Sequence, residues 1–468
     1  MRARQIDFGA VRAELGIVAD FPEAVTAEGS KAVDRCADRR TDRTDLELVT
    51  IDPPGSMDLD QALRVVADDD GFDVHYAIAD VAALVAPGGA VDAESRRRGQ
   101  TVYFPDGSVP LHPRVLSEGL GSLLPDQTRP AVLWTVRVDR NGDCVHVDVE
   151  RALVRSRARL DYAGVMAAID TDSLPAAITG LPSFGEVRET WALARGAVQL
   201  ELPDQEAVPH DGGRAWTLQL APSTPADRWN AQVSLLIGMC AGKIMLDAGV
   251  GLLRTLPPAA PEAVGELAAT ASNLKVDWPA GLTPGQFLAG LDPAAPTTLA
   301  LMTSAARLMR GAGYLMLDAA SSSLPEAKVA HAGVGGVYAH VTAPLRRLAD
   351  RFATEVCLAV TAGEPVPDWT LDALPSLGKT MSASDSVAST ANRRSIDLAE
   401  AVVLSDQVGA RFAATVMRSA NGKRPAEIFI ASPAIIAACD PAPDAGTRCQ
   451  VELTEADPVT TAVEFRVV

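Results

Sequence analysis

The chain lacks the cysteine pattern of a zinc-binding or disulfide-rich protein. Its six cysteines are scattered and contain no C-x-x-C pair, which argues against both classes and suits a reducing compartment. No run of 18 apolar residues is present, so we expect no membrane span. The first residues form no apolar signal segment, and we therefore expect a cytoplasmic protein.

Common catalytic and nucleotide-binding motifs are absent as well. The sequence contains no G-x-x-x-x-G-K phosphate loop, no G-x-G-x-x-G after a predicted strand and no G-x-S-x-G elbow. It also lacks an excess of positive charge, since its net charge is −18. A protein that binds nucleic acid over a broad surface should be basic, so the charge alone favours an enzyme with another substrate. If the chain does bind nucleic acid, its basic residues must be concentrated in a channel.

The 468 residues, 47% of them hydrophobic, can bury a large core and predict two or three domains. Residues 1–45 are predicted to be a mainly helical N-terminal extension. Alternating apolar residues then predict strands, and longer periodic runs predict helices over 228–248, 259–275, 297–317, 343–361 and 383–404. From residue 408 to 468 regularly spaced strands suggest a small closed barrel of OB type, with a generic β-domain as the alternative.

An acidic loop follows the short apolar strand predicted at residues 48–51. Asp52, Asp58 and Asp60 fall within nine residues, and the Pro-Pro-Gly run at residues 53–55 keeps this segment from being helix or strand. Asp58 and Asp60 alternate with apolar residues, so in an extended chain both point the same way. Clustered Asp oxygens favour Mg²⁺ or Mn²⁺. The loop taken alone leaves a metal site and an acidic surface turn about equally plausible.

Two further clusters could carry chemistry. Residues 338–351 contain His340 just before a predicted helix, which Thr342 can cap. Arg346 and Arg347 lie near the N-terminus of that helix, where two guanidiniums would bind phosphate well. The alternative is an ordinary solvated helix face with an Arg346–Asp350 ion pair. The other cluster is residues 98–105, where a tyrosine follows a basic run in a chain with only 4% aromatic residues. That ring could stack on a nucleic-acid base or could belong to the core.

In this order, these stretches resemble the RNB catalytic domain of the ribonuclease II family of exoribonucleases. The resemblance is dense over residues 39–165 and recurs at 226–257 and 338–361. It rests on the acidic loop at 52–60, Ala77-Ile78-Ala79-Asp80-Val81, Arg98-Gly99-Gln100-Thr101-Val102-Tyr103, Pro110-Leu111-His112-Pro113 and the segment at 340–347.

The resemblance implies an α+β fold, with a mixed sheet and packed helices in an RNB-type domain at 46–405 and an OB-type RNA-binding barrel at 408–468. It implies a monomeric, Mg²⁺-dependent enzyme that hydrolyses single-stranded RNA from the 3′ end to nucleoside 5′-monophosphates, with Mn²⁺ as an alternative ion. The metal ligands implied are Asp52, Asp58, Asp60 and Gln61, with Asp58 and Asp60 also catalytic.

The remaining roles follow from the same resemblance. Arg346 is expected to stabilise the charge on the scissile phosphate, and Tyr103 to stack on the terminal bases. His340, Thr342 and Arg347 are expected to contact the substrate.

The sequence departs from the family pattern at four positions. Gln61 stands where the family has a fourth acid, Ala343 replaces a serine, Val250 replaces an aromatic residue, and Asn392 replaces a glutamate. Gln61 and Asn392 motivate an alternative hypothesis, in which the chain is a catalytically impaired RNB protein that binds RNA as a scaffold or regulator.

Overall fold

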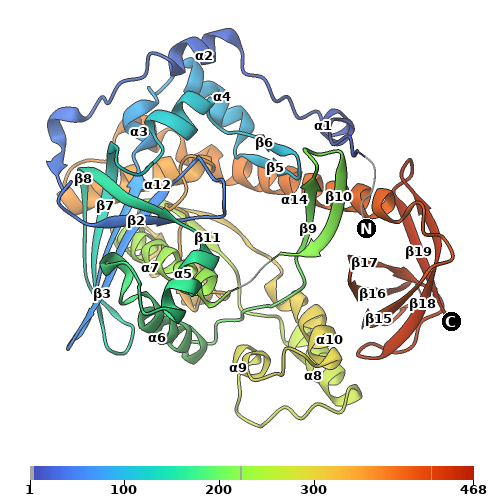
Figure 1. The fold of residues 1–468 in the computed structure, drawn as a ribbon. Helices are drawn as coiled ribbons and strands as arrows, with labels where there is room; N and C mark the ends of the chain where they lie inside the picture. Colours follow the sequence, from blue (N-terminus) through green and yellow to red (C-terminus); the bar gives the residue numbers. More distant parts are fainter. Residues whose placement is uncertain (1–4, 222–223, 423) are drawn as a thin grey trace.

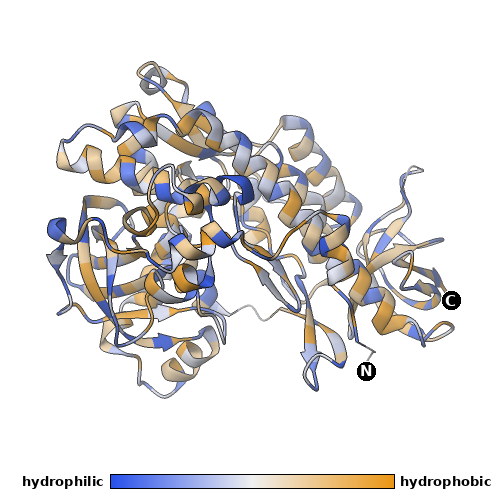
Figure 2. Cartoon of the chain, turned by 90° about the horizontal axis from the view of Figure 1, so that it is seen from above, coloured by the Kyte–Doolittle hydropathy of each residue, from blue (hydrophilic) through white to orange (hydrophobic). Residues whose placement is uncertain are grey.

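A computed structural model describes residues 5–221, 224–422 and 424–468. Residues 1–4 of the expected N-terminal extension therefore lie outside the described residues. The chain forms a large α+β body and a closed five-stranded barrel, and the long helix α14 (Leu374–Leu404) runs from the body to the barrel (Figure 1). Figure 2 shows apolar residues concentrated where helices and strands pack against one another.

A curved, mixed sheet organises the large body. Its strand order is β1-β8-β2-β3-β4-β7, with a further β7–β8 pairing. The long strand β8 pairs first antiparallel with β7 and then parallel with β2, so the sheet curls back on itself. The alternating pattern of β7 explains its place, because Val132, Trp134 and Val136 are all fully buried. The strand bounds are β1 (Thr41–Asp42), β2 (Leu48–Ile51), β3 (Gln61–Asp68), β4 (Gly71–Ala79), β7 (Thr128–Asp139) and β8 (Cys144–Leu160).

Helix α7 (Pro225–Ala248) packs at the centre of the body against α5 (Tyr162–Asp170), α6 (Leu181–Ala194) and α12 (Leu348–Ala362). It begins with a capping box between Thr224 and Asp227 and ends at Gly249, whose φ of +67° suits glycine. Among the described helices, α7 alone is long and apolar enough to cross a membrane. Half of its apolar window is buried, however, and the core helix of a folded domain meets the same criteria.

The C-terminal strands form the predicted barrel, in the order β15-β16-β17-β19-β18. Their bounds are β15 (Arg411–Arg418), β16 (Ala426–Ala431), β17 (Ala434–Cys439), β18 (Arg448–Asp457) and β19 (Ala462–Val467). Ile428, Ile435, Val451 and Phe465 fill its interior. The α+β fold with a mixed sheet and a terminal barrel is therefore confirmed.

Two predicted helices are partly wrong. The segment at 297–317 is helical only in α10 (Pro296–Ala305) and a short 3₁₀ turn, and it ends as strand β12 (Gly313–Leu317) paired with β11 (Gly251–Thr255). Gly311, at a φ of +93°, breaks the helical path. The helix predicted from residue 343 begins only at Leu348. The N–H of Leu345 donates to Asp60 and that of Leu348 to the Gly99 carbonyl, in place of bonds to the residues four positions earlier.

Other elements complete the fold. The hairpin of β9 (Gln205–His210) and β10 (Ala215–Leu220) contacts α14 and the barrel strand β17. The remaining named helices and strands are α1 (Gly9–Glu14), α2 (Glu23–Gly29), α3 (Val81–Leu84), α4 (Ala90–Arg98), α8 (Pro261–Asn273), α9 (Pro284–Ala289), α11 (Glu326–Val329), α13 (Asp368–Leu371), β5 (Val102–Phe104), β6 (Gly107–Val109), β13 (Ala330–His331) and β14 (Gly336–Val337).

Candidate functional site

The acidic loop connects β2 to β3 without regular secondary structure, as predicted. The backbone N–H of Asp52 donates to the Leu160 carbonyl at 3.1 Å, which fixes the start of the loop against β8. Leu59 is fully buried, and its N–H donates to the Ser122 hydroxyl at 3.0 Å. Since Leu59 points into the core, the flanking Asp58 and Asp60 are turned toward the opposite side.

Asp60 is the most enclosed carboxylate of the loop, with 4% of its surface exposed. Its Oδ1 accepts a hydrogen bond from the Leu345 N–H at 2.7 Å, and the Arg346 Nε lies 3.5 Å from its Oδ2. Burial raises the pKa of Asp60 to about 8, although the Arg346 charge opposes this shift. An ionised Asp60 is therefore costly unless more positive charge is brought close.

Asp52 and Asp58 lie close enough to influence each other. Burial first, and then the charge of Asp58, raise the pKa of Asp52 to about 6, while Arg346 and Arg159 oppose the shift. Asp58 accepts a hydrogen bond from the Tyr103 hydroxyl at 3.3 Å. The structure thus brings together three carboxylates that repel one another, next to two arginines.

These carboxylates provide the oxygen donors that a hard divalent cation prefers, and a cation would relieve their repulsion. Asp52, Asp58 and Asp60 are therefore the residues that fit a metal ion. In their present positions, no group of three His, Cys, Asp or Glu side chains within the described ranges is close enough to surround one. Binding would require the three carboxylates to converge.

Gln61 does not fit the expected role of metal ligand. Its Oε1 accepts hydrogen bonds from the hydroxyls of Tyr76 and Ser234, and its Nε2 donates to the Thr342 carbonyl at 2.7 Å. Both the oxygen and the nitrogen of the Gln61 amide therefore have hydrogen-bond partners within the protein. Gln61 instead ties the first residue of β3 to α7 and to the segment at 340–347.

The segment at 340–347 separates its two arginines. Arg347 donates to Asp350 Oδ2 at 2.8 Å, an oxygen that also accepts the Ala343 N–H at 2.7 Å. The predicted Arg346–Asp350 pair is therefore wrong. Arg346 instead extends toward Asp60, with 43% of its side chain exposed.

Thr342 and Arg347 have structural contacts rather than open surfaces. Thr342 is 4% exposed, and its hydroxyl accepts a hydrogen bond from Arg347 at 3.3 Å. It does not cap α12, whose N-cap position is Arg347. These contacts hold the segment that presents Arg346, and contact of the two residues with substrate stays a prediction.

Tyr103 occupies the outer face of β5. Its neighbours Val102 and Phe104 are buried, whereas Tyr103 is 49% exposed, so the interpretation of Tyr103 as a core residue is wrong. The Thr101 N–H donates to the Arg346 carbonyl at 2.9 Å, which joins this strand to the arginine segment. Burial of the hydroxyl and the nearby Asp58 charge raise the pKa of Tyr103.

His340 lies among aromatic rings. Its Nδ1 is 3.1 Å from the Tyr314 hydroxyl, and the rings of Tyr314 and Tyr338 meet it edge to face. Burial, with the Arg347 and Arg254 charges, holds the pKa of His340 well below its usual value. A neutral imidazole of this kind suits hydrogen bonding better than ionic contact with a phosphate.

Sequence reasoning missed most of the tyrosines. Tyr162 lies beside Asp52, whose charge adds to burial in raising the pKa of the phenol. All five tyrosines of the chain, at 76, 103, 162, 314 and 338, contact or adjoin the acidic loop or His340. The sequence contains no other tyrosine, so the positions of this residue type could have pointed to the site.

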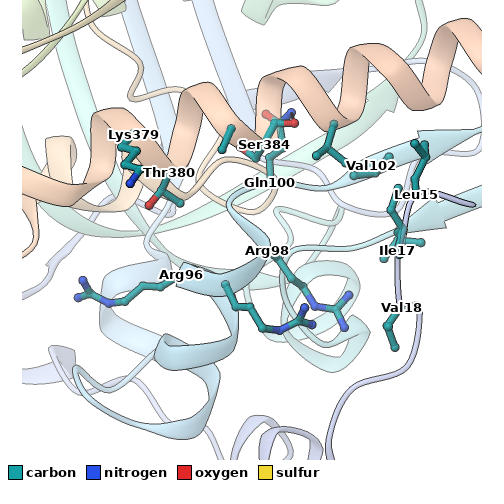
Figure 3. A pocket seen from close by; sticks show the side chains of 15 residues that line it. Leu15, Ile17, Val18, Arg96, Arg98, Gln100, Val102, Lys379, Thr380 and Ser384 are labelled. Atoms are coloured by element: carbon teal, nitrogen blue, oxygen red, sulfur yellow. Dashed lines mark hydrogen bonds between the residues drawn. The ribbon is translucent and has the colours of Figure 1, made fainter. Parts of the chain in front are cut away.

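A hollow of about 420 Å³ lies behind β5, between the N-terminal segment, α4 and α14 (Figure 3). Arg96 and Arg98 line one side, and Lys379 and Thr380 line the other. Gln100 also lines the hollow. Its Nε2 donates to the Ser384 carbonyl at 3.0 Å, and its backbone bridges to Arg347. This basic hollow thus adjoins the site through Gln100.

Comparison with known proteins agrees with this arrangement. Residues 40–360 match the RNB domain, and residues 410–468 match the C-terminal S1 domain of RNase II-type exonucleases. Exoribonuclease 2 of Vibrio vulnificus (strain YJ016) is 29% identical over 241 residues, which cover 49% of this chain and 36% of that protein. The chain therefore spans only about a third of the length of such curated relatives.

Two solved structures share the fold. Mycoplasma genitalium RNase R in complex with ribose-methylated single-stranded RNA superposes with a TM-score of 0.87 at 19% identity, over 98% of this chain and 77% of that one. Yeast Ssd1, described as a pseudonuclease, superposes with a TM-score of 0.68 at 14% identity, over 87% of this chain and 51% of that one. At these identities the likeness extends to the fold alone.

Proposed function

Because the chain belongs to the RNB-domain family of RNase II-type exonucleases, we propose that it is a hydrolytic 3′→5′ exoribonuclease. Its substrate is single-stranded RNA, and its products are nucleoside 5′-monophosphates. The observation that carries the proposal is the convergence of Asp58, Asp60, Arg346 and Tyr103 at one site from three distant parts of the sequence.

The carboxylates support a requirement for Mg²⁺, with Mn²⁺ as the alternative. Asp52, Asp58 and Asp60 would hold the ion, which when bound lowers the pKa of a water molecule and polarises the phosphate. The raised pKa values of Asp52 and Asp60 support this assignment, because added positive charge favours their ionised forms.

Arg346 and Tyr103 would act on the substrate directly. The exposed guanidinium of Arg346 can donate hydrogen bonds to a phosphate next to Asp60 and stabilise the charge that develops there. The half-exposed ring of Tyr103 can stack on a terminal base, while its hydroxyl remains on Asp58. Gln61, Thr342 and Arg347 would hold these groups in place through their hydrogen bonds.

An RNA substrate is compatible with a net charge of −18 because positive charge is gathered at the site. Arg159, Arg254, Arg346 and Arg347 act on the carboxylates, tyrosines or histidine there. A site of this kind suits one strand of RNA rather than a broad surface contact. We extend the proposal to the cytoplasm, since all six cysteines are free thiols. The family resemblance implies a monomer.

A second candidate is an RNB protein that binds RNA without cleaving it. The neutral Gln61, the solvent-exposed Asn392 and the fold likeness to a described pseudonuclease favour it. The presence of Asp52, Asp58 and Asp60 together with Arg346 favours the enzyme, because none of these charged groups has been lost.

Incubation of uniformly radiolabelled poly(A) with the protein and Mg²⁺ tests the proposal. We expect release of AMP, and its loss in Asp60→Asn but not in Asp69→Asn, a control at an exposed acid in the β3–β4 turn. Tight RNA binding without release of mononucleotides from the wild-type chain would refute the enzyme and support the second candidate.

A further inference from the structure

Two cysteine thiols meet on the side of the sheet where β8 begins. The Cys240 thiol, on α7, donates to the Cys144 sulfur with an Sγ–Sγ distance of 3.6 Å. Cys144 is exposed, whereas Cys240 is buried. The two sulfurs are thus in contact, although 96 residues separate them in the chain.

A buried arginine lies beside the pair. Arg188 is only 2% exposed, and it contacts the Gly142 carbonyl at 2.5 Å, the Met239 sulfur at 3.3 Å and the Trp191 ring at 4.0 Å. Its Nε has no hydrogen-bond partner, and within the described ranges no carboxylate forms an ion pair with it, although the charge of Asp143 acts on it. A buried cation without an anionic partner stabilises any negative charge that forms nearby.

The two thiols differ in acidity chiefly because of the hydrogen bond between them. The hydrogen bond from Cys240 lowers the pKa of Cys144 to about 7, and the Arg188 charge contributes in the same direction, whereas burial and Asp143 oppose it. The pKa of Cys240 is raised instead, by the same hydrogen bond and by burial. Cys144 is thus the thiol that ionises first, and thiolates are the reactive form.

A cavity of about 730 Å³ gives small molecules access to this pair. Its lining includes Cys144, His146, Trp191, Met239 and Cys240. The other cysteines lack this combination: Cys36, Cys357 and Cys439 are buried, and Cys449 is only partly exposed.

We propose that Cys144 is a site of thiol oxidation by hydroperoxides, and that Cys240 resolves the oxidised sulfur to an intrachain disulfide. In the first step the Cys144 thiolate attacks the distal oxygen of the hydroperoxide. An S–O bond forms, the O–O bond breaks, and the alkoxide or hydroxide that leaves takes up a proton, so Cys144 becomes a sulfenic acid.

In the second step the Cys240 sulfur attacks the Cys144 sulfur. An S–S bond forms and the S–O bond breaks, and the departing hydroxide takes the Cys240 proton as water. Two thiols and one hydroperoxide thus give one disulfide, one alcohol or water, and one further water. The product would join β8 to α7, the helix whose Ser234 contacts Gln61.

The test treats the full chain with a small excess of hydrogen peroxide, blocks free thiols and maps the products by mass spectrometry. We expect a mass lower by two hydrogen atoms, a Cys144–Cys240 cross-linked peptide and full reversal by dithiothreitol. Cys144→Ser and Cys240→Ser should each abolish the cross-link, whereas Cys449→Ser, at another accessible thiol, should retain it.

A second measurement uses only the wild-type chain, so it tests the proposal even if the cysteine variants fold poorly. In the untreated wild-type chain, iodoacetamide should label Cys144 faster than the other five cysteines, with half-maximal rate near pH 7. Oxidation that leaves Cys144 and Cys240 unlinked, or equal labelling of all accessible thiols, would overturn the proposal. Neither readout depends on RNA cleavage, so this proposal can fail while the exoribonuclease proposal stands.

Discussion

Replacement of Asp60 by asparagine should stabilise the metal-free protein while it removes activity. The folded chain holds the pKa of Asp60 near 8, compared with 3.8 for an ordinary aspartate, chiefly because the carboxylate is buried. Asparagine keeps an oxygen that can accept the Leu345 N–H but carries no charge to desolvate. The variant should therefore fold with the same hydrogen bond and without the electrostatic cost.

The direction of the pH dependence follows from the raised pKa. Below pH 4 the Asp60 carboxyl is protonated in both the folded and unfolded states, so it costs no stability. Between about pH 4 and pH 8 the unfolded chain loses the proton more readily than the folded chain, and stability falls as the pH rises. The difference corresponds to on the order of 5 kcal/mol, an upper bound if the loop relaxes.

Urea denaturation in EDTA at several values between pH 5 and pH 8.5 measures this effect. The free energy of unfolding of the wild type should fall with pH more steeply than that of Asp60→Asn, and the variant should be a few kcal/mol more stable at pH 8.5. Addition of Mg²⁺ should restore stability to the wild type and leave the variant nearly unchanged. Asp69→Asn should follow the wild type.

The reasoning would be refuted if Asp60→Asn were less stable than the wild type at pH 8.5 in EDTA, or if both chains had the same pH slope. A shallow residual slope in the variant is expected, because Asp52 has its own raised pKa of about 6. That remaining loss should fall between about pH 4 and pH 6, and it should disappear in the Asp52→Asn, Asp60→Asn double variant.

Three further outcomes are expected. Arg346→Ala should reduce AMP release roughly 10²–10³-fold. Its melting temperature should change little, because the Arg346 side chain is 43% exposed, and the solvent-exposed control Arg140→Ala should retain activity. Full turnover in Arg346→Ala would contradict the role assigned to this arginine. Tyr103→Ala should change the length of the limit product on gels, whereas Tyr103→Phe should not, since it keeps the ring; identical products from all three chains would exclude stacking. Gln61→Glu should lower the free energy of unfolding by about 1–3 kcal/mol, because the Thr342 carbonyl loses its hydrogen-bond donor. The Mg²⁺ concentration needed for activity should stay the same. A lower Mg²⁺ requirement in this variant would restore position 61 as a metal ligand.

The sequence by itself determined the parts of the fold that depend on neighbouring residues. The alternation in β7, the Pro-Pro-Gly interruption at 53–55, the long apolar helix α7 and the spaced strands of the barrel are local patterns, and each predicted its element. The order of the motifs also identified Asp52, Asp58, Asp60, Arg346 and Tyr103 as candidates. Local patterns failed at 313–317, where pairing with β11 overrides the helical periodicity.

The tertiary structure decided what each candidate contacts. Sequence alone could not assign Arg346 to Asp60 and Arg347 to Asp350, because adjacent arginines look alike until the turn before α12 separates them. Nor could it reveal that Gln61 is occupied by the Thr342 carbonyl, 281 residues away. A hydrogen bond or buried charge takes its energy from the partner that folding brings to it. For Arg346 and Gln61 the partners, Asp60 and the Thr342 carbonyl, lie in distant segments of the chain.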